Sequence, residues 1–347
     1  MKKTLKTVAI AAATMITTGA FASVTSNMEN PLYTPKSGQF YSKTGLGLMY
    51  KKSDHTNAMR KKGTAGDPEF PVYRATEDFG YGFSDSLTGY ASLGYTHNGD
   101  IDRRGMHRGR LGLNYRVVET LENFVWDIYG EGYLSGVSPM KGSYDVDGFT
   151  YKNFSNGRWG AVFGTKIGKK WSKLTTSMFF EYLQTIGNHN NEIELNRFDL
   201  TKFGMGTPMA TSLGFPDKIA VDLKSTNETT IGVNAFYQAN DRWSLGGGFR
   251  FVEHSDNGVK SIHTPMVQLP AAQAALRQQV INGLLSETKD MDDGWHEYIV
   301  SGVLANQVTD YLQLALVGEY TFDFSHPNSQ NGTDVKMELG VRANVRF

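Results

Sequence analysis

The stretch EHSDNG (253–258) holds the residue types of a serine hydrolase, with a histidine next to a serine and close to an aspartate. In nucleophilic catalysis the imidazole takes the proton of the hydroxyl, so the two side chains must lie on the same side of the chain. Successive side chains of an extended segment point to opposite sides. Asp256 therefore shares a side with His254, whereas Ser255 points away from the base that would have to activate it.

A second stretch, NFSNGR (153–158), supplies Ser155 but has Asn153 where the base would have to stand. Both stretches resemble the H-x-S-N-G motif of outer-membrane phospholipase A, in which the histidine is the base and the serine two residues later is the nucleophile. Each departs from that motif at one of these two positions, and the sequence contains neither G-x-S-x-G nor H-E-x-x-H. We therefore expect no enzymatic activity.

Metal and redox chemistry have little support in the sequence. DMDDG (290–294) lacks at least one ligand position of a calcium-binding loop, and an exposed acidic loop tip is its simpler interpretation. The eight histidines show no metal-binding spacing, and the absence of cysteine excludes disulfides, thiol catalysis and cysteine-ligated zinc. We expect neither a metal site nor a cofactor.

Residues 1–22 have the features of a signal peptide. Three lysines precede the apolar run VAIAAATMITTGAFA, and Ala20-Phe21-Ala22 has the small-x-small pattern of a cleavage site. Removing this segment takes three lysines and no acid from a chain with 35 basic and 35 acidic side chains, so the exported protein is slightly acidic. Because nucleic-acid binding normally needs a basic surface, we expect no such partner.

The stretch DVKMELGVRANVRF (334–347) alternates strictly between polar and apolar residues, and a period of two predicts a strand with one apolar face. No apolar run after residue 22 is long enough for a membrane-spanning helix, whereas alternating segments of this length suit a membrane β-barrel. The same alternation predicts further strands, twelve in all, near 39–51, 71–83, 86–97, 109–118, 123–135, 157–167, 171–183, 228–239, 243–253, 297–305, 310–324 and 334–347.

The connections between these strands strictly alternate in length. The tight ones are 83–86, 118–123, 168–170, 239–241 and 305–310. The longer ones are 52–70, 98–108, 136–152, 185–226, 255–295 and 325–333. Outer-membrane barrels have short periplasmic turns, long outer loops and an even number of strands. We therefore expect residues 39–347 to form an all-β, transmembrane, antiparallel up-and-down barrel of about twelve strands with long outer loops.

Three segments allow two interpretations each. The stretches 192–200 and 217–225 also alternate and would raise the count to fourteen, but 201–216 would then lie on the periplasmic side, so we prefer an outer hairpin. The stretch 270–285 has helical spacing and predicts a helix that lies on other outer loops or plugs the lumen. Residues 23–38 form a periplasmic N-terminal segment in the simpler interpretation, or else enter the lumen from below.

The end of the stretch 334–347 resembles the C-terminal signal of bacterial outer-membrane proteins, in which a terminal aromatic residue follows alternating apolar ones. Phe347 and Val345 carry the resemblance. It implies the outer membrane of a Gram-negative bacterium as the location, and the barrel-assembly machinery, outer-membrane lipid and lipopolysaccharide as partners. An aromatic girdle at the periplasmic interface would include Phe347, Phe83, Phe124, Trp171 and Trp243.

Charged residues at the alternate positions would line the lumen: Lys43, Arg74, Asp78, Arg110, Arg116, Asp127, Glu131, Lys166, Lys173, Glu181, Arg250, Glu319, Asp323, Lys336, Glu338, Arg342 and Arg346. Twelve strands enclose more space than side chains fill, so these charges would meet water. We expect a porin-like channel for passive diffusion of small polar solutes or ions, with solvated arginines near its periplasmic mouth. The alternatives are a sealed, salt-bridged barrel and a surface-display or adhesion barrel acting through loops 185–226 and 255–295.

Overall fold

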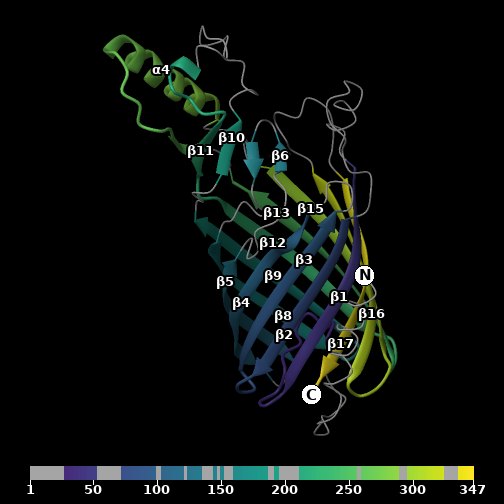
Figure 1. Ribbon diagram of the computed structural model, residues 1–347. Helices are drawn as coiled ribbons and strands as arrows, with labels where there is room; N and C mark the ends of the chain where they lie inside the picture. Colours follow the sequence, from purple (N-terminus) through teal and green to yellow (C-terminus); the bar gives the residue numbers. More distant parts are fainter. Residues whose placement is uncertain are drawn as a thin grey trace.

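Twelve strands close into one antiparallel barrel in the computed structural model (Figure 1). Among the described residues, no helix has both the length and the apolar character needed to cross a membrane. The structure describes residues 27–52, 72–98, 103–120, 123–134, 144–146, 149–151, 159–186, 191–194, 211–255, 259–288, 295–323 and 335–347.

Each barrel strand pairs with its neighbours in chain order, and the last strand pairs with the first, so the up-and-down topology is confirmed. The barrel strands are β1 (Phe40–Lys52), β2 (Val72–Gly82), β3 (Leu87–Asn98), β4 (Arg103–Glu119), β5 (Phe124–Leu134), β8 (Trp159–Trp171), β9 (Leu174–Ile186), β12 (Asn227–Gln238), β13 (Trp243–His254), β15 (Trp295–Gln307), β16 (Leu312–Asp323) and β17 (Val335–Arg346).

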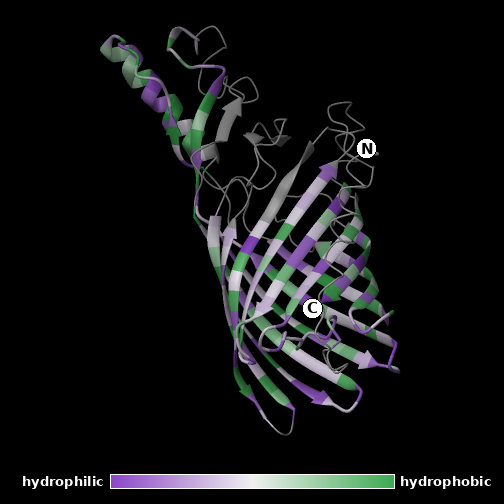
Figure 2. Ribbon diagram, turned by 60° about the horizontal axis from the view of Figure 1, so that its bottom comes forward, coloured by the Kyte–Doolittle hydropathy of each residue, from purple (hydrophilic) through white to green (hydrophobic). Residues whose placement is uncertain are grey.

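The outer surface of the barrel carries an apolar belt. Large side chains such as Leu46, Leu111, Phe163 and Met178 are exposed on the outward faces of their strands. Apolar and polar residues alternate along the strands (Figure 2). In lipid every backbone N–H and C=O must be paired, and a closed barrel meets this need because it has no free edge. The alternation therefore assigns the apolar half of each strand to the membrane and the polar half to the lumen.

Glu77 lies within this belt, on the outward face of β2. Its two carboxylate oxygens each accept a hydrogen bond of 2.6 Å, one from the Ser42 hydroxyl and the other from the Thr44 hydroxyl. Both donors are on the neighbouring strand β1, and Thr44 stands directly opposite Glu77. These hydrogen bonds reduce the cost of placing a carboxylate on the lipid-facing surface.

The largest differences from the predicted strand boundaries are at the end of β8 and at the start of β4. The predicted turn at 168–170 is part of β8, because the outward positions Ile167, Lys169 and Trp171 continue the alternation and keep their pairing with β9. The turn lies at 172–173, where Ser172 takes a left-handed φ of 42°. Strand β4 begins at residue 103, above the apolar segment, because its ladder with β3 continues beyond the membrane belt.

A second, five-stranded sheet lies at the end of the barrel opposite the short turns (Figure 1). Its strands pair in the order β14, β11, β10, β7, β6. The preferred outer hairpin is confirmed, because β10 pairs with β11 and neither strand joins the barrel. The strands are β6 (Tyr144–Val146), β7 (Phe149–Tyr151), β10 (Asn191–Glu194), β11 (Lys218–Leu223) and β14 (Val259–His263).

The helix α4 (Ala271–Thr288) packs on this outer sheet. Val280 and Leu284 on its inner face form a buried cluster with Leu213, Phe215 and Ile219. The interpretation that the helix lies on other outer loops is therefore confirmed, and α4 does not plug the lumen.

The barrel closes where β17 meets β1. The amide of Phe347 donates to the carbonyl of Phe40 at 2.9 Å, and the amide of Phe40 donates back at 3.2 Å. The two rings lie 6.0 Å apart between centroids. Aromatic contact and backbone pairing thus hold the same point of the seam.

Replacing Phe347 with Asp should weaken this closure. The change removes a ring contact and places a charge at the membrane interface, together about 1–2 kcal/mol. We expect a lower folded yield on refolding into lipid vesicles, measured by heat-modifiable migration in gel electrophoresis. Phe347→Tyr keeps the ring and should fold as the unmodified protein does. Equal folded yields for all three proteins would contradict this role of Phe347 in closing the barrel.

Candidate functional site: the barrel lumen

Residues 27–36, called the N-terminal segment below, lie inside the lower end of the barrel. Asn27 donates from Nδ2 to Ser244 Oγ at 2.7 Å and accepts at Oδ1 from Gln313 Nε2 at 2.8 Å. Asn30 donates to Thr175 Oγ1 at 2.9 Å. These partners belong to β13, β16 and β9, on different sides of the barrel. The described part of this segment is therefore not the expected periplasmic tail but crosses the lumen.

Glu29 is the charged anchor of the N-terminal segment. Arg342 Nη1 donates to both carboxylate oxygens, at 3.1 and 2.9 Å, and Asn344 Nδ2 donates to one of them at 2.7 Å. The Lys43 ammonium donates to the neighbouring Met28 carbonyl at 2.6 Å. Burial alone would raise the pKa of Glu29, but Lys43, Arg342 and the hydrogen bonds hold that pKa below its usual value of 4.5.

A second anchor binds the backbone of the segment. Arg116 Nη2 donates to the Leu32 carbonyl at 2.8 Å, while its Nε donates to Asp127 at 2.9 Å and its Nη1 to Glu119 at 2.9 Å. The Leu32 side chain is fully buried. Because one guanidinium joins two strands and the segment, the segment is held at a fixed depth.

The expected ring of free arginines at the periplasmic mouth is wrong. Arg342 binds Glu29, Arg116 binds Asp127, and Arg346 Nε donates to the Asp310 carbonyl at 3.0 Å. Buried cations need such partners, and the protein itself supplies them.

Higher in the lumen, arginines and glutamates of different strands form ion pairs. Arg74 lies 2.5 Å from Glu338, and Arg110 lies 3.2 Å from Glu131. Arg250 forms a further pair with Glu319. These pairs line the wall and leave space between them.

The structure places most of the predicted lumen residues on the inward faces of the barrel strands. Lys173 differs, because it lies exposed in the 172–173 turn and donates to the Ala239 carbonyl. Asp323 and Lys336 are in β16 and β17, but their side chains lie outside the described part. Those on inward faces are Lys43, Arg74, Asp78, Arg110, Arg116, Asp127, Glu131, Lys166, Glu181, Arg250, Glu319, Glu338, Arg342 and Arg346.

Sequence reasoning missed the uncharged members of the lumen wall. The Tyr90 hydroxyl donates to Glu131 at 2.7 Å, and the Tyr129 hydroxyl donates to Glu181 at 2.7 Å. Both tyrosines occupy inward positions, so the alternation that selected the charges also contained them. Glu29 precedes the first strand, and no periodicity marks it.

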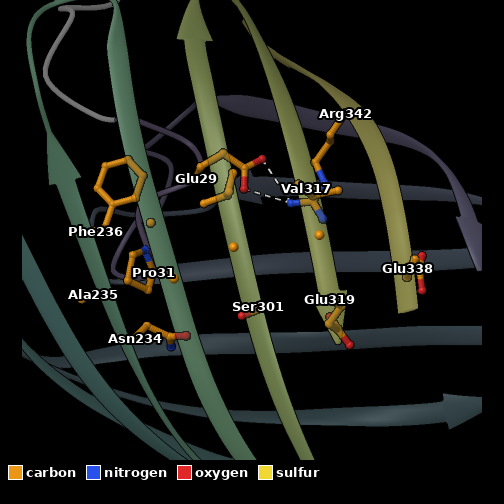
Figure 3. A pocket seen from close by; sticks show the side chains of 15 residues that line it. Glu29, Pro31, Asn234, Ala235, Phe236, Ser301, Val317, Glu319, Glu338 and Arg342 are labelled. Carbon is orange, nitrogen blue, oxygen red and sulfur yellow. Dashed lines mark hydrogen bonds and ion pairs between the residues drawn. The ribbon is translucent and has the colours of Figure 1, made fainter. Parts of the chain in front are cut away.

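The lumen above the N-terminal segment contains cavities between these side chains. One, of about 270 Å³, is lined by Glu29, Asn234, Ser301, Glu319 and Arg342, among others (Figure 3). A second, of about 250 Å³, shares Glu319 and Arg342 with the first. A third, of about 330 Å³, shares Asn234 with the first. The shared residues show that these spaces adjoin.

The hydrolase-like stretch shows no assembled catalytic pair among its described residues. Ser255 Oγ accepts a hydrogen bond of 2.8 Å from the Asn227 amide. His254 Nδ1 lies 3.3 Å from a Glu228 oxygen. Asp256, Ser155 and the stretch 290–294 lie outside the described residues.

The segment should leave its place when its anchor is removed. Arg342→Gln strands the buried Glu29 carboxylate, a change that typically costs several kcal/mol. We would introduce Leu32→Cys into this chain, which has no cysteine, and measure labelling by a soluble thiol reagent. Labelling should be at least about tenfold faster with Arg342→Gln. Arg250→Gln, which changes an arginine paired elsewhere, is the control, and equal rates in all proteins would contradict the anchor.

Acid should release the segment in the same way. The folded-state pKa of Glu29 is below that of a free carboxyl, so its contribution to docking is present above about pH 4.5 and is lost as pH falls through the folded-state pKa. Single-channel conductance in planar bilayers should therefore rise on acidification below pH 4.5. Glu29→Gln should remove that step, and a step of the same size in this variant would assign it to another group.

A search of solved structures finds this fold at low sequence identity. An outer-membrane channel from Pseudomonas putida F1 aligns over 93% of this chain and 100% of its own, with 12% identity and a TM-score of 0.55. The NanC porin aligns over 86% and 98%, with 10% identity and a TM-score of 0.40, too low to carry an argument.

Outer-membrane phospholipase A from Escherichia coli aligns over 92% of this chain and 94% of its own, with 9% identity and a TM-score of 0.37, and carries no argument either. The sequence matches no protein-family model and no curated protein. The closed barrel of twelve strands, its apolar belt and the likeness to the P. putida channel show that this chain folds as a bacterial outer-membrane β-barrel.

Proposed function

We propose that the protein is an outer-membrane channel through which small polar solutes or ions diffuse passively. The observation that carries this proposal is the set of adjoining cavities above the N-terminal segment. A sealed barrel would fill this space with side chains. Here the ion pairs lie against the wall and the space between them remains.

The lining suits hydrated solutes. Arg74, Arg250 and Arg342 face the same cavity as Asp78 and Glu338. Opposite charges on facing parts of a wall orient polar molecules and replace part of their hydration. An apolar solute would gain nothing from this surface, so we propose sugars, amino acids or small ions as the class carried.

The N-terminal segment narrows the route at its periplasmic end. A cavity of about 190 Å³ below it is lined by Asn27, Asn30, Leu32 and Lys173, and Tyr33 borders both this cavity and the 330 Å³ cavity above. The segment thus separates two cavities through which a solute must pass. In this proposal its position determines the conductance.

The proposed function is not enzymatic. Ser255, the hydroxyl nearest to a histidine in EHSDNG, is engaged with the backbone of the neighbouring strand. Neither stretch with hydrolase-like composition has a histidine two residues before a serine, the spacing that would put base and nucleophile on the same side of an extended chain.

A second candidate is a surface-binding role for the outer sheet. The outer loops form a sheet covered by α4, with buried clusters that include Ile219, Val221 and Val280. A folded unit on the outside of a barrel presents a defined surface to other molecules. This observation favours the surface-display alternative over a barrel whose loops serve only as connections.

The channel proposal is tested by conductance and by swelling of liposomes in sugars, amino acids and salts. Purified protein should conduct in planar bilayers, and Glu29→Gln should raise the conductance by about two- to tenfold because the segment loosens. Lys36→Gln, at an exposed lysine of the same segment, is the matched control. Protein that inserts but passes no probe, with or without Glu29→Gln, would overturn the channel and leave the surface role.

A further inference from the structure

The 330 Å³ cavity has a wall of aromatic rings. Its lining includes Tyr41, Tyr90, Tyr129 and Phe179, each on the inward face of a different strand. Ligand pockets of this size are typically lined by such rings together with a few polar groups that fix orientation. The cavity therefore has the general make-up of a binding site.

Glycines on the neighbouring strands allow these rings to lie flat against the wall. A Cβ on Gly164 would overlap the ring of Tyr129, and one on Gly232 would lie 2.5 Å from the ring of Phe179. Tyr41 lies on a glycine in the same way. Because the rings occupy the space that side chains would otherwise fill, the centre of the cavity stays open.

Two polar side chains of this cavity have no hydrogen-bond partner among the described residues. Thr88 and Asn114 are 4% and 9% exposed and line the cavity, and no hydrogen bond of either side chain occurs within the described part of the chain. Both residues border the cavity, so their polar groups can take a partner from outside the protein. Water or a polar ligand can supply it.

Lys166 and Glu181 supply opposite charges to the same cavity without pairing with each other. Among the described residues Lys166 forms no hydrogen bond or ion pair, and Glu181 accepts a hydrogen bond from Tyr129 alone. Asp127, directly across from Lys166 on β5, is already bound through two bonds by Arg116. One cation and one anion are thus left facing the open space.

The strand register sets the spacing of these charges. Lys166 stands opposite Phe179 on β9, so Glu181 is its diagonal neighbour. Diagonal neighbours across a sheet are about 7–8 Å apart, which leaves room for a small group between their ends. The other carboxylate in the cavity, Glu131, has its own partners in Arg110 and Tyr90.

We infer that this cavity binds a small zwitterion, in which an ammonium and a carboxylate are separated by one or two atoms, as in an α-amino acid. The carboxylate lies at Lys166, the ammonium lies at Glu181, and the side chain of the ligand packs on the rings. The inference rests on the proposed channel function and names the solute class of its lumen.

Binding to the purified full-length protein in detergent tests this inference without requiring conduction. The probes are L-phenylalanine, 3-phenylpropionate, which lacks the ammonium, and 2-phenylethylamine, which lacks the carboxylate. Isothermal titration should show binding of phenylalanine, with each single-charge analogue about ten- to a hundredfold weaker. Equal affinity for all three probes, or no binding of any, would overturn the site.

Variants locate the binding. Lys166→Met and Glu181→Gln should each weaken phenylalanine binding by at least about tenfold, whereas Lys173→Gln, in the exposed turn, should not change it. Gly164→Ala should push the Tyr129 ring into the cavity and block binding. Gly132→Ala is its control, because the new methyl would meet nothing closer than a backbone oxygen at 3.8 Å. Unchanged binding in Lys166→Met and Gly164→Ala would overturn the assignment.

The two proposals can fail separately. Conduction of ions without phenylalanine binding would leave the channel and remove the zwitterion site. Selective phenylalanine binding without conduction would leave the site and remove the channel.

Discussion

The structure depends on the requirement that every backbone hydrogen-bonding group be paired inside lipid. One ladder closes the circle, from β17 to β1, and without it two strand edges would face hydrocarbon. Closure in turn separates two surfaces. The outward half of each strand is selected for contact with lipid, and the inward half is free to carry polar chemistry. The charges of the lumen are therefore a consequence of the same constraint that produces the apolar belt.

Within the lumen, charge pairing determines what is filled and what stays open. Arg116 binds the Leu32 carbonyl and Arg342 binds the Glu29 carboxylate. Both contacts hold the N-terminal segment inside the barrel. Arg74 and Arg250 each pair with a glutamate two strands away and lie along the wall. Lys166 has no such partner among the described residues. The contrast explains why the lower lumen is crossed by protein while the upper lumen keeps its cavities.

The fold could be predicted because the relevant signals are local. Alternation at Leu312, Leu314 and Leu316 marks a strand without knowledge of its partner, and the alternating loop lengths add the topology. The turn after β8 was misplaced because Gly-Lys-Lys has turn composition, whereas pairing with β9 decided the boundary. The site was only partly predictable, since Asn27 meets Gln313 across 286 residues of sequence and no short-range pattern encodes that contact. Tyr129 was not among the predicted lumen residues, because only charged residues were selected at the inward positions.

The anchoring of Glu29 has a consequence for the order of biogenesis. Its partners Arg342 and Asn344 lie on β17, which is the last barrel strand along the chain. The segment that precedes the first strand therefore cannot reach its final position until the final strand has arrived. The contacts with β4, β9 and β13 do not depend on β17, but the ion pair of Glu29 with Arg342 does. The ion pair between Glu29 and Arg342 can therefore form only when the last strand stands beside the first.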